Sequence, residues 1–298
     1  MKIIITGASG FVGQNLSEYL IENDITIQSL SLRKEWNMDK YADTIIHLAG
    51  KAHDTSNISA DEEYFEVNTE LTKKLFDEFM RSDIRDFIYF SSVKATADTV
   101  VGILDEEHIS DPKTPYGKSK LLAEQYLLSK DLPLDKRLFI IRPCMIHGIG
   151  NKGNLNLLYK VVEKGIPWPL AAFENKRSFL SIDNLNFLIL QIIKDKNIQS
   201  GIYNFADDDF ISTNQLIRII SSISRKKSRL WHLPVKCIVF AAKMGDKVRM
   251  PLNSERLKKL TESYLVSNKK IKKALRINKL PVSAEEGLIK TIKSFQSK

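Results

Sequence analysis

The chain has few cysteines, and the two present form no recognisable pattern. Cys144 and Cys237 lie far apart in apolar surroundings and match neither a CxxC motif nor a disulfide framework. The segment from Met1 to Gly7 lacks the basic and apolar regions of a signal peptide. No uncharged apolar run reaches the roughly 18 residues that a membrane-spanning helix needs. We therefore expect a reduced, cytoplasmic protein without a transmembrane segment, and we predict no metal site.

Glycine and proline are also scarce, with 13 and 9 residues among 298. Hydrophobic residues make up 43% of the chain and charged residues 27%, which is typical of an ordered globular protein. The length allows one large α/β unit or two modest domains with a buried core. A peptide, a small disulfide scaffold and a fibre are thereby excluded.

Acidic residues become rare toward the C-terminal end. From Arg218 onward there are 21 Lys and Arg residues but 5 Asp and Glu, whereas the first 217 residues hold 24 and 31. An anionic ligand, an anionic membrane surface or a nucleic acid would each fit this charge. Basic residues scattered on solvated helices are the simpler explanation, because the charges alternate with apolar positions. No nucleic-acid-binding motif is present, so we expect no nucleic-acid partner.

Continuous apolar segments alternate with helical patterns over the first half of the chain. Four of the predicted strands, all except Thr26 to Leu30, are apolar at successive positions and fit a parallel sheet covered on both faces. The helical patterns carry apolar residues at spacings of three and four, so the predicted fold is a Rossmann-type, doubly wound α/β sheet. The predicted strands are Lys2 to Thr6, Thr26 to Leu30, Thr44 to Leu48, Phe87 to Ser91 and Leu138 to Arg142, and the predicted helices are Phe11 to Glu22, Glu62 to Met80 and Tyr116 to Ser129.

After Pro143 the pattern becomes irregular, and helices rich in Lys and Arg follow. We therefore expect a dinucleotide-binding domain over residues 1–147, to which residues 178–206 return. Residues 148–298 then form mainly a smaller α/β substrate domain. In such a fold the ligand lies in the crevice at the carboxyl ends of the strands.

A glycine-rich loop follows the first predicted strand directly. Gly7, Gly10 and Gly13 are spaced GxxGxxG between that strand and a helix. Without Cβ atoms, the backbone there can approach a pyrophosphate at the helix N-terminus. A lone glycine pattern is weak, but its place after the opening strand predicts a dinucleotide site.

The cofactor preference is indicated by the end of the second predicted strand. Enzymes that prefer NAD place Asp or Glu there to bind the adenosine ribose. This chain has Ser31, then Arg33 and Lys34, so no carboxylate repels a 2′-phosphate and two cations can bind it. NADPH is therefore favoured over NADH, with NAD as the alternative if Arg33 and Lys34 simply face solvent.

A candidate catalytic pair opens the helix after Pro115. Tyr116 and Lys120 are four residues apart and share one helical face, where an ammonium would lower the pKa of the phenol toward neutrality. Such a tyrosine exchanges a proton with an alcohol during hydride transfer. Ser92, at the end of a predicted strand, is suited to hold the substrate oxygen. Alone, the pair also fits a lysine-rich surface, but with Ser92 and the glycine loop it predicts an active site.

These motifs resemble the extended short-chain dehydrogenases/reductases of the NAD-dependent epimerase/dehydratase family, in its nucleotide-sugar class. The similarity spans nearly the whole chain and rests on ITGASGFVG (5–13), IIHLAG (45–50), FIYFSS (87–92), PYGKSKLLAE (115–124) and IRPCMIHGIG (141–150). SSVKA (91–95), GNKGN (150–154) and NKRSFLSIDNL (175–185) look most like bacterial enzymes that interconvert UDP-N-acetylquinovosamine or UDP-N-acetylfucosamine with the 4-keto-6-deoxy sugar.

The resemblance implies a role for each matching residue. Ser92, Tyr116 and Lys120 match the catalytic residues, with Tyr116 as acid/base and Lys120 as its partner. The implied cofactor contacts are Gly7, Ser9, Gly10, Phe11, Val12 and Gly13 at the pyrophosphate, Leu48, Ala49 and Gly50 beside the ribose and nicotinamide, and Pro143 near the nicotinamide. Asn154 and Arg177 match residues at the UDP diphosphate. Lys51 and Lys94 are further candidates for substrate contacts, and His53 reads as a loop residue.

Three departures from the family pattern reduce the number of reactions that we expect. Val93 and Lys94 replace the Asp-Glu pair of 4,6-dehydratases, so water elimination is not expected. His147 stands where Tyr is common, and Ser31 replaces the usual acid, which puts NAD retention in doubt. A 4-epimerase keeps its cofactor through both half-reactions, whereas a reductase exchanges it.

The main hypothesis is an NAD(P)H-dependent reductase of the C4 keto group of a UDP-4-keto-6-deoxy-N-acetylhexosamine, serving surface polysaccharide synthesis. The alternatives are a UDP-N-acetylhexosamine or UDP-glucose 4-epimerase with bound NAD, and a non-catalytic NADP-sensing regulator. The helices from Glu62 to Met80 and from Tyr116 to Ser129 keep apolar residues beyond one face. They predict a homodimer through a four-helix bundle.

Overall fold

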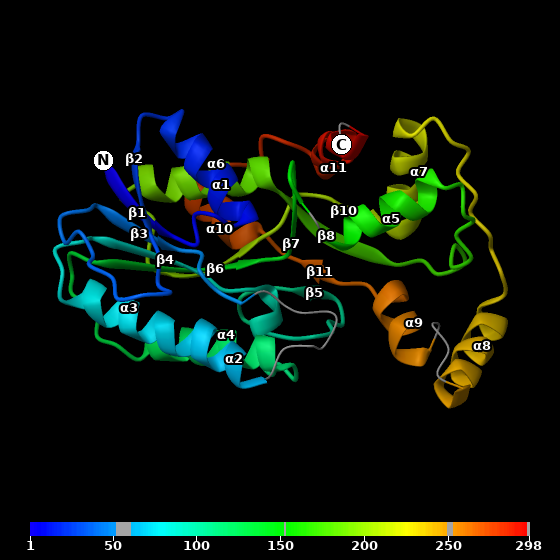
Figure 1. The fold of residues 1–298 in the computed structure, drawn as a ribbon, viewed down its shortest axis with the longest axis horizontal. Coiled ribbons are helices and arrows are strands. Elements are labelled where there is room, and N and C mark those ends of the chain that lie inside the picture. Colours follow the sequence, from blue (N-terminus) through cyan, green and yellow to red (C-terminus); the bar gives the residue numbers. More distant parts are fainter. Residues whose placement is uncertain (52–60, 152, 249–252, 297–298) are drawn as a thin grey trace.

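A six-stranded parallel β-sheet forms the centre of the computed structural model, which describes residues 1–51, 61–151, 153–248 and 253–296 (Figure 1). In spatial order its strands are β2 (Thr26–Leu30), β1 (Lys2–Thr6), β3 (Thr44–His47), β4 (Asp86–Phe90), β6 (Arg137–Pro143) and β9 (Gly201–Phe205). All neighbouring pairs are parallel. The predicted doubly wound α/β sheet is confirmed.

Both faces of the sheet are covered by helices, which explains the continuous apolar strands. In β1, Ile3 and Ile5 belong to one hydrophobic layer and Ile4 to the other, because successive side chains point to opposite faces. The first layer is covered by α1 (Phe11–Ile21), α6 (Ile182–Lys194) and α10 (Lys269–Leu275), and the second by α3 (Leu71–Met80) and α4 (Pro115–Leu128).

The helix predicted from Glu62 to Met80 is not continuous. α2 (Asp61–Phe65) passes into a π-helical turn, η1 (Glu66–Glu70), before α3 begins. Short π-helical segments inside α-helices are frequent at functional sites. The turn buries Asn68 and Thr69 against the start of α4, so the irregularity lies beside the predicted catalytic helix.

A second, smaller group of elements follows β6. β7 (Met145–His147), β8 (Lys176–Ser181) and β10 (Phe210–Ser212) form a three-stranded sheet, with α5 (Asn154–Glu163), α7 (Thr213–Ile223) and α11 (Ala284–Gln296) packed around their own hydrophobic cluster. β5 (Ile103–Leu104) pairs with β11 (Leu265–Val266), and η2 (Val93–Ala95) is a 3₁₀ turn after β4. Chain segments far apart in sequence therefore meet beyond the carboxyl ends of the central strands.

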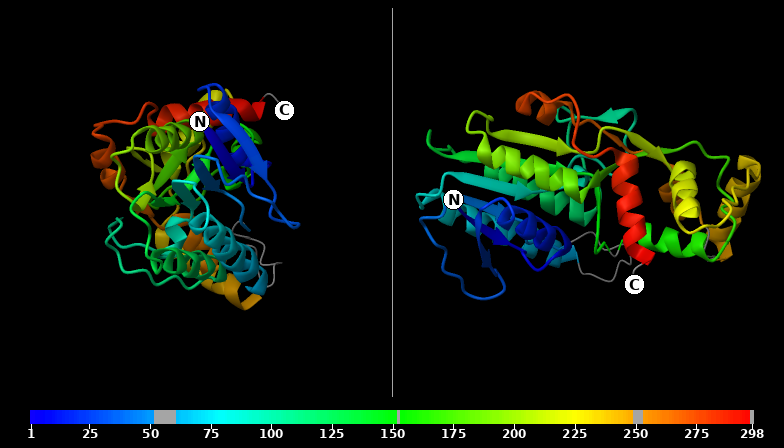
Figure 2. Two further views of the ribbon diagram at one scale, coloured as in Figure 1. Left: turned by 90° about the vertical axis from the view of Figure 1, so that its left-hand side faces the viewer. Right: turned by 90° about the horizontal axis from the view of Figure 1, so that it is seen from above.

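Two further helices form an arm at the end of the molecule remote from the central sheet (Figures 1 and 2). They are α8 (Val235–Val248) and α9 (Ser254–Thr261). Their shared core is small: Ile238, Ala242 and Leu257 pack with Leu170.

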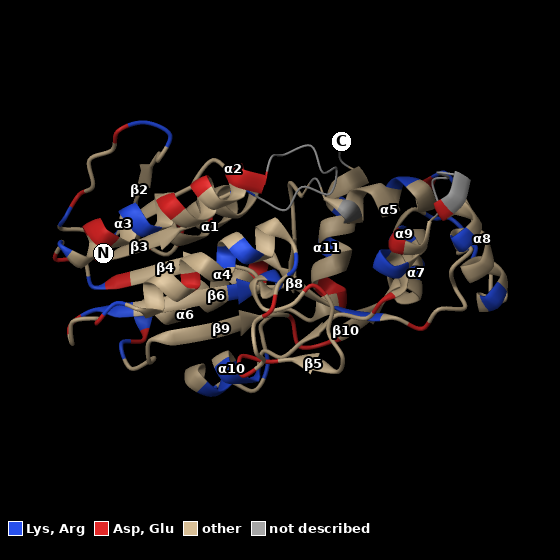
Figure 3. Ribbon diagram, turned by 90° about the horizontal axis from the view of Figure 1, so that it is seen from below, with Lys and Arg blue, Asp and Glu red and all other residues tan. Residues whose placement is uncertain are grey.

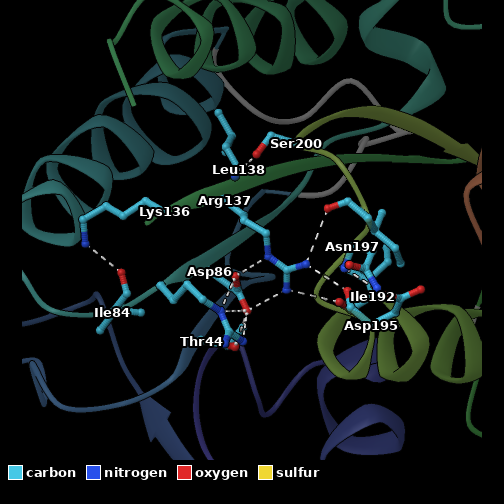
Figure 4. Close-up of polar contacts among 12 residues, drawn as sticks. Thr44, Ile84, Asp86, Lys136, Arg137, Leu138, Ile192, Asp195, Asn197 and Ser200 are labelled. Carbon is cyan, nitrogen blue, oxygen red and sulfur yellow. Dashed lines mark hydrogen bonds and ion pairs between the residues drawn. The ribbon is translucent and has the colours of Figure 1, made fainter. Parts of the chain in front are cut away.

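The amino ends of β4 and β6 are joined by a buried charge pair. Asp86 opens β4 in register with Arg137, which opens β6, and only 1% of the Asp86 side chain is exposed. Arg137 donates from Nε to Asp86 Oδ1 at 2.8 Å and from Nη2 to Oδ2 at 3.0 Å, and it also donates to the carbonyl oxygen of Asp195 (Figure 4). Nearby, Lys136 Nζ donates to the carbonyl oxygen of Ile84 at 2.7 Å. Each of these charges has a partner within hydrogen-bond distance.

Candidate active site

The glycine-rich turn between β1 and α1 packs so closely that side chains are excluded. Gly7 has φ +72°, and a Cβ there would lie 2.7 Å from the backbone nitrogen of Ala49. A Cβ on Gly13 would lie 2.3 Å from the carbonyl oxygen of Gly7. Ser9 and Gly10 are exposed, and no side chain among the described residues caps α1 at Gly10. The N-terminal amides of α1 are thus suited to a phosphate, so the turn fits a dinucleotide cofactor.

A buried hydrogen-bonded chain fixes the end of β3 next to this turn. The Thr72 hydroxyl donates to the carbonyl oxygen of Asn68, so it accepts from His47 Nε2 at 2.9 Å. His47 Nδ1 then accepts from the Thr6 hydroxyl at 2.6 Å, and Thr6 in turn accepts from the backbone N–H of Ala49 at 3.1 Å. Burial lowers the pKa of His47 to about 3, so the imidazole is neutral and its tautomer is set by the two threonines.

The structure brings Ser92 and Tyr116 together. Ser92 follows β4 and caps η2, accepting from the backbone N–H of Lys94 at 3.2 Å, and its hydroxyl lies close enough to Tyr116 to act on the pKa of the phenol. Thr114 caps α4 by accepting from the Gly117 N–H. A Cβ on Gly117 would lie 2.4 Å from the carbonyl oxygen of Lys94. Glycine there lets α4 approach η2 closely enough for the two hydroxyl groups to meet.

The predicted effect of Lys120 on Tyr116 is wrong for this structure. The pKa of Tyr116 lies above its ordinary value because burial raises it, and the hydrogen bond from Ser92 lowers it only in part. Lys120 Nζ instead donates to the carbonyl oxygen of Phe90 at 2.8 Å. Burial lowers the pKa of Lys120 itself to about 8. In this geometry Tyr116 is a protonated acid.

Glu124 and Arg142 support this helix from behind, and sequence analysis missed both. Arg142 donates from Nε and Nη2 to Glu124, with the shortest distance 2.5 Å, and their side chains are 3% and 1% exposed. The Ser91 hydroxyl also donates to Glu124. Glu124 lies one turn after Lys120, as Lys120 does after Tyr116, and this spacing was the available signal. The pair ties α4 to the ends of β4 and β6.

Asn68 holds the backbone that follows β3. Its Oδ1 accepts from the Lys51 N–H at 2.7 Å, and its Nδ2 donates to the Lys51 carbonyl oxygen and to Ser119 Oγ. A Cβ on Gly50 would lie 2.9 Å from Asn68 Oδ1 and 3.2 Å from Lys120 Nζ. The Lys51 ammonium forms an ion pair with Glu63. His53 lies outside the described residues.

The other predicted cofactor contacts lie at the same end of the sheet. Ser31 and Arg33 are exposed just after β2, Leu48 and Ala49 are half-buried after β3, and Pro143 is buried at the end of β6. Phe11 and Val12 pack partly into the sheet core. These positions are compatible with the predicted roles, which stay predictions.

Two predicted substrate contacts form a cationic cluster beyond Ser92. Lys94 Nζ donates to the carbonyl oxygen of Asp98 at 2.7 Å and lies 4.2 Å from the ring centroid of Tyr264. Arg177 donates to the backbone carbonyls of Lys259 and Glu262. Burial lowers the pKa of both Lys94 and Arg177. Because their hydrogen bonds go to neutral carbonyls, both charges remain available to an anion.

Asn154 opens α5, and its side chain lies outside the described part of the chain. Within residues 1–51, 61–151, 153–248 and 253–296, no group of His, Cys, Asp and Glu is arranged to hold a metal ion. Over the same residues, every helix is too short or too polar to cross a membrane.

The sequence matches the NAD dependent epimerase/dehydratase family over residues 3–206. It is 30% identical to the UDP-glucose 4-epimerase of Vibrio cholerae, over 99% of this chain and 95% of that protein. It is also 30% identical to the N-acetyl-alpha-D-glucosaminyl-diphospho-ditrans,octacis-undecaprenol 4-epimerase of Escherichia coli O157:H7, over 78% of this chain and 75% of that protein. A UDP-2-acetamido-2,6-beta-L-arabino-hexul-4-ose reductase of Pseudomonas aeruginosa is 30% identical over 52% of this chain and 38% of that protein.

Solved structures share the fold over the whole chain. RMD from Pseudomonas aeruginosa complexed with NADPH superposes with a TM-score of 0.76 at 19% identity, covering 100% of this chain and 99% of that one. The UDP-glucuronic acid 4-epimerase of Bacillus cereus in complex with NAD gives 0.75 at 18% identity, with the same coverage. Together with the glycine turn and the Ser92–Tyr116 contact, these matches show that the chain belongs to the NAD dependent epimerase/dehydratase family of enzymes, which act on nucleotide sugars.

Proposed function

We propose that the protein is a cytoplasmic NAD(P)H-dependent reductase of the C4 keto group of a UDP-4-keto-6-deoxy-N-acetylhexosamine. Its product would be UDP-N-acetylquinovosamine or UDP-N-acetylfucosamine, for surface polysaccharide. The observation that carries the proposal is the half-buried, protonated Tyr116 next to Ser92, near a turn that fits a dinucleotide. Val93 and Lys94, in place of an acid pair, leave the site without the groups for water elimination. The similarity to a 4-keto sugar reductase supports the same reaction.

Each side chain of the site has its own role in the proposed reduction. A bound nicotinamide cofactor supplies the hydride. Ser92 orients the keto oxygen, and Tyr116 protonates that oxygen as the C4 alcohol forms, because its raised pKa keeps the proton on the phenol until then. Lys120 places a cation next to the Gly50 backbone. Asn154 and Arg177 hold the diphosphate, and Lys51 and Lys94 contact the sugar or its phosphates.

The proposed cofactor is NADPH, with NAD as the alternative. Ser31 and Arg33 are both exposed after β2, where an incoming 2′-phosphate can reach them. A charge-assisted hydrogen bond from the guanidinium to this phosphate is expected to favour NADPH. Solved relatives bind either NADPH or NAD, so the fold is compatible with both.

A 4-epimerase with bound NAD is the second candidate. Its support is the similarity over almost the whole chain to a UDP-glucose 4-epimerase, and over most of it to a 4-epimerase of an undecaprenol-linked sugar. A non-catalytic NADP-sensing regulator on this fold has no use for the Ser92–Tyr116 contact, so it ranks last.

Nucleotide absorbance and product analysis test the proposal. Purified protein is mixed with NADPH and a panel of UDP-keto sugars, and the absorbance of the reduced nicotinamide is followed. A reductase consumes NADPH in proportion to product, and the NMR spectrum of the product gives the C4 configuration. Interconversion of UDP-N-acetylglucosamine or UDP-glucose with no net change in absorbance would establish the epimerase instead. Cofactor binding without turnover of any sugar nucleotide would leave the regulator.

We also propose a homodimer formed through a four-helix bundle, built on a dinucleotide domain over residues 1–147 to which residues 178–206 return. α4 exposes 45% of Leu122 and 52% of Leu128, whereas Ala123 and Leu127 on the same helix are buried. Pairing these side chains with a second copy would remove them from water. Light scattering at micromolar concentration checks this, since a strict monomer contradicts it.

A further inference from the structure

The arm formed by α8 and α9 has an outer face that the active site does not use. Ile238 and Ala242 of α8 point inward and pack with Leu257 and Leu170. Lys236, Phe240, Lys243 and Met244 recur at intervals of three and four and occupy the opposite side of α8. α8 therefore carries large apolar residues both on the side that packs against the protein and on its outward side, where they alternate with lysines.

These apolar residues are strongly exposed. Phe240 is 67% and Met244 44% exposed on α8, and Trp231 and Leu233, in the segment leading into α8, are 54% and 41% exposed. We call these four residues, with Lys236 and Lys243, the arm surface. A face on which aromatic and aliphatic side chains stand among lysines matches helices that lie in the boundary between lipid headgroups and acyl chains.

The arm carries an excess of positive charge. Residues 231–261, which cover α8, α9 and the segment leading into α8, contain 7 Lys and Arg but 2 Asp and Glu. Both acids are already engaged: Asp246 accepts from Ser254 at 2.6 Å, and Glu255 pairs with Lys259 at 2.6 Å. Figure 3 shows the basic residues on α8 and α9 at this end of the molecule. Anionic headgroups attract such a surface, with an energy that grows with each lysine or arginine near the membrane.

We propose that the arm surface docks the protein on an anionic membrane. A nucleic acid would attract the lysines but would give Phe240 and Met244 no apolar environment, whereas a bilayer satisfies both. A second copy of the chain would bring its own excess of positive charge against this one, which opposes pairing. Docking here leaves the central sheet remote from the membrane, since the arm lies at the far end of the molecule (Figure 2). The proposal does not depend on which sugar nucleotide the active site takes.

Cosedimentation of the full chain with vesicles tests the docking. We expect binding to vesicles made of equal parts phosphatidylcholine and phosphatidylglycerol, little binding to phosphatidylcholine alone, and weaker binding as salt is raised. Lys236→Gln with Lys243→Gln should weaken partitioning about 25-fold, at about fivefold for each charge. Phe240→Ser with Met244→Ser should weaken it about tenfold or more.

Exposed residues remote from the arm supply matched controls. Leu134→Ser and Lys40→Gln remove an exposed apolar group and an exposed charge, and both should bind vesicles like the wild type. Turnover of a water-soluble sugar nucleotide, measured without vesicles, should be the same in the arm variants, which shows that they fold and separates docking from catalysis.

Several results would overturn the docking. They are equal binding to both kinds of vesicle, absence of binding to either, or arm variants that bind as tightly as the controls. Binding to a polynucleotide but not to vesicles would assign the basic residues to nucleic acid. A wild-type dimer that becomes monomeric in the Phe240→Ser, Met244→Ser variant would assign the arm surface to a second copy.

Discussion

The two ends of the central sheet use burial in opposite ways. At the amino end, burial alone would raise the pKa of Asp86, but hydrogen bonds from Arg137 and Arg85 outweigh it and hold the pKa below its usual value. At the carboxyl end, burial prevails: it lowers the pKa of His47 and of Lys120 and raises that of Tyr116 (three residues of the site). The charge of Asp86 is thus compensated by two guanidinium groups, whereas the pKa values of His47, Lys120 and Tyr116 are set mainly by burial.

This contrast separates stability from chemistry within one sheet. Asp86 and Arg137 are register partners on adjacent strands, as Thr6 and His47 are at the opposite end. The first pair is ionic, and the second is a neutral hydrogen bond. Changes to the Asp86–Arg137 pair should therefore alter mainly the free energy of unfolding, whereas changes to Tyr116 and Arg33 at the carboxyl end should alter mainly turnover and ligand binding.

Replacing the proton donor should give the largest effect. Tyr116→Phe keeps the ring in its packing against Tyr64 but removes the hydroxyl next to Ser92. We expect kcat to fall about 100-fold to 10,000-fold, as is typical for loss of a general acid. Cofactor affinity and urea unfolding should stay close to wild type. Retention of more than half of the wild-type kcat would remove Tyr116 from the catalytic role.

Removing the buried carboxylate should give the converse result. Asp86→Ala leaves Arg137 and Arg85 without their ionic partner, so we expect a loss of about 3 to 5 kcal/mol in the free energy of unfolding. The nearby exposed Asp83 supplies the control, because Asp83→Ala should change stability by less than about 0.5 kcal/mol. Urea denaturation measures both. If the Asp86 variant were as stable as the control, the contrast between the two ends would fail.

Arg33 tests whether an exposed residue at the carboxyl end sets ligand choice without affecting stability. Arg33→Ala should lower kcat/KM for NADPH about 10-fold to 150-fold and barely change that for NADH, because only NADPH carries the 2′-phosphate. Lys40→Ala, an exposed cation farther along the same connection, should leave both values unchanged. Equal weakening of both cofactors, or equal use of both by the wild type, would show that Arg33 only faces solvent.

The smallest of these expected effects is on the pH dependence of the free energy of unfolding, in which His47 at the carboxyl end and Asp86 at the amino end act over different pH ranges. The pKa of His47 is about 3 in the folded protein against 6.5 for an ordinary histidine, so between these values the unfolded chain binds more protons. Stability is therefore lost as pH falls through this window, by about 2 kcal/mol at about pH 5. Asp86 contributes only at lower pH, because its folded pKa is below 3.8.

Urea unfolding near pH 7 and pH 5 measures this loss. His47→Gln should lower stability at the higher pH but flatten its fall toward the lower one. His108→Gln, at a histidine whose side chain is 40% exposed, serves as the control and should keep the wild-type slope. An unchanged slope in the His47 variant would place the acid sensitivity elsewhere in the molecule.

The sequence predicts the elements of the sheet well because β1, β3, β4 and β6 are continuous apolar runs. The π-helical turn around Asn68 was missed, because one extra residue in a single turn changes the spacing of the apolar residues too little to be recognised. Four-residue spacing placed Tyr116 and Lys120 on one face but gave the wrong direction for the phenol pKa, because spacing does not show that Lys120 turns toward the Phe90 carbonyl. The Glu124–Arg142 pair joins positions 18 residues apart, which no local pattern connects.

The contact between Gly117 and the carbonyl oxygen of Lys94 offers a way to adjust the reaction from outside the reacting groups. A methyl group at position 117 would push α4 and η2 apart, since its carbon would lie only 2.4 Å from the carbonyl oxygen of Lys94. Either helix must then shift, and the Ser92 and Tyr116 hydroxyl groups separate while both residues remain. The size of the side chain at position 117 would therefore set the distance between the Ser92 and Tyr116 hydroxyl groups without replacing either residue.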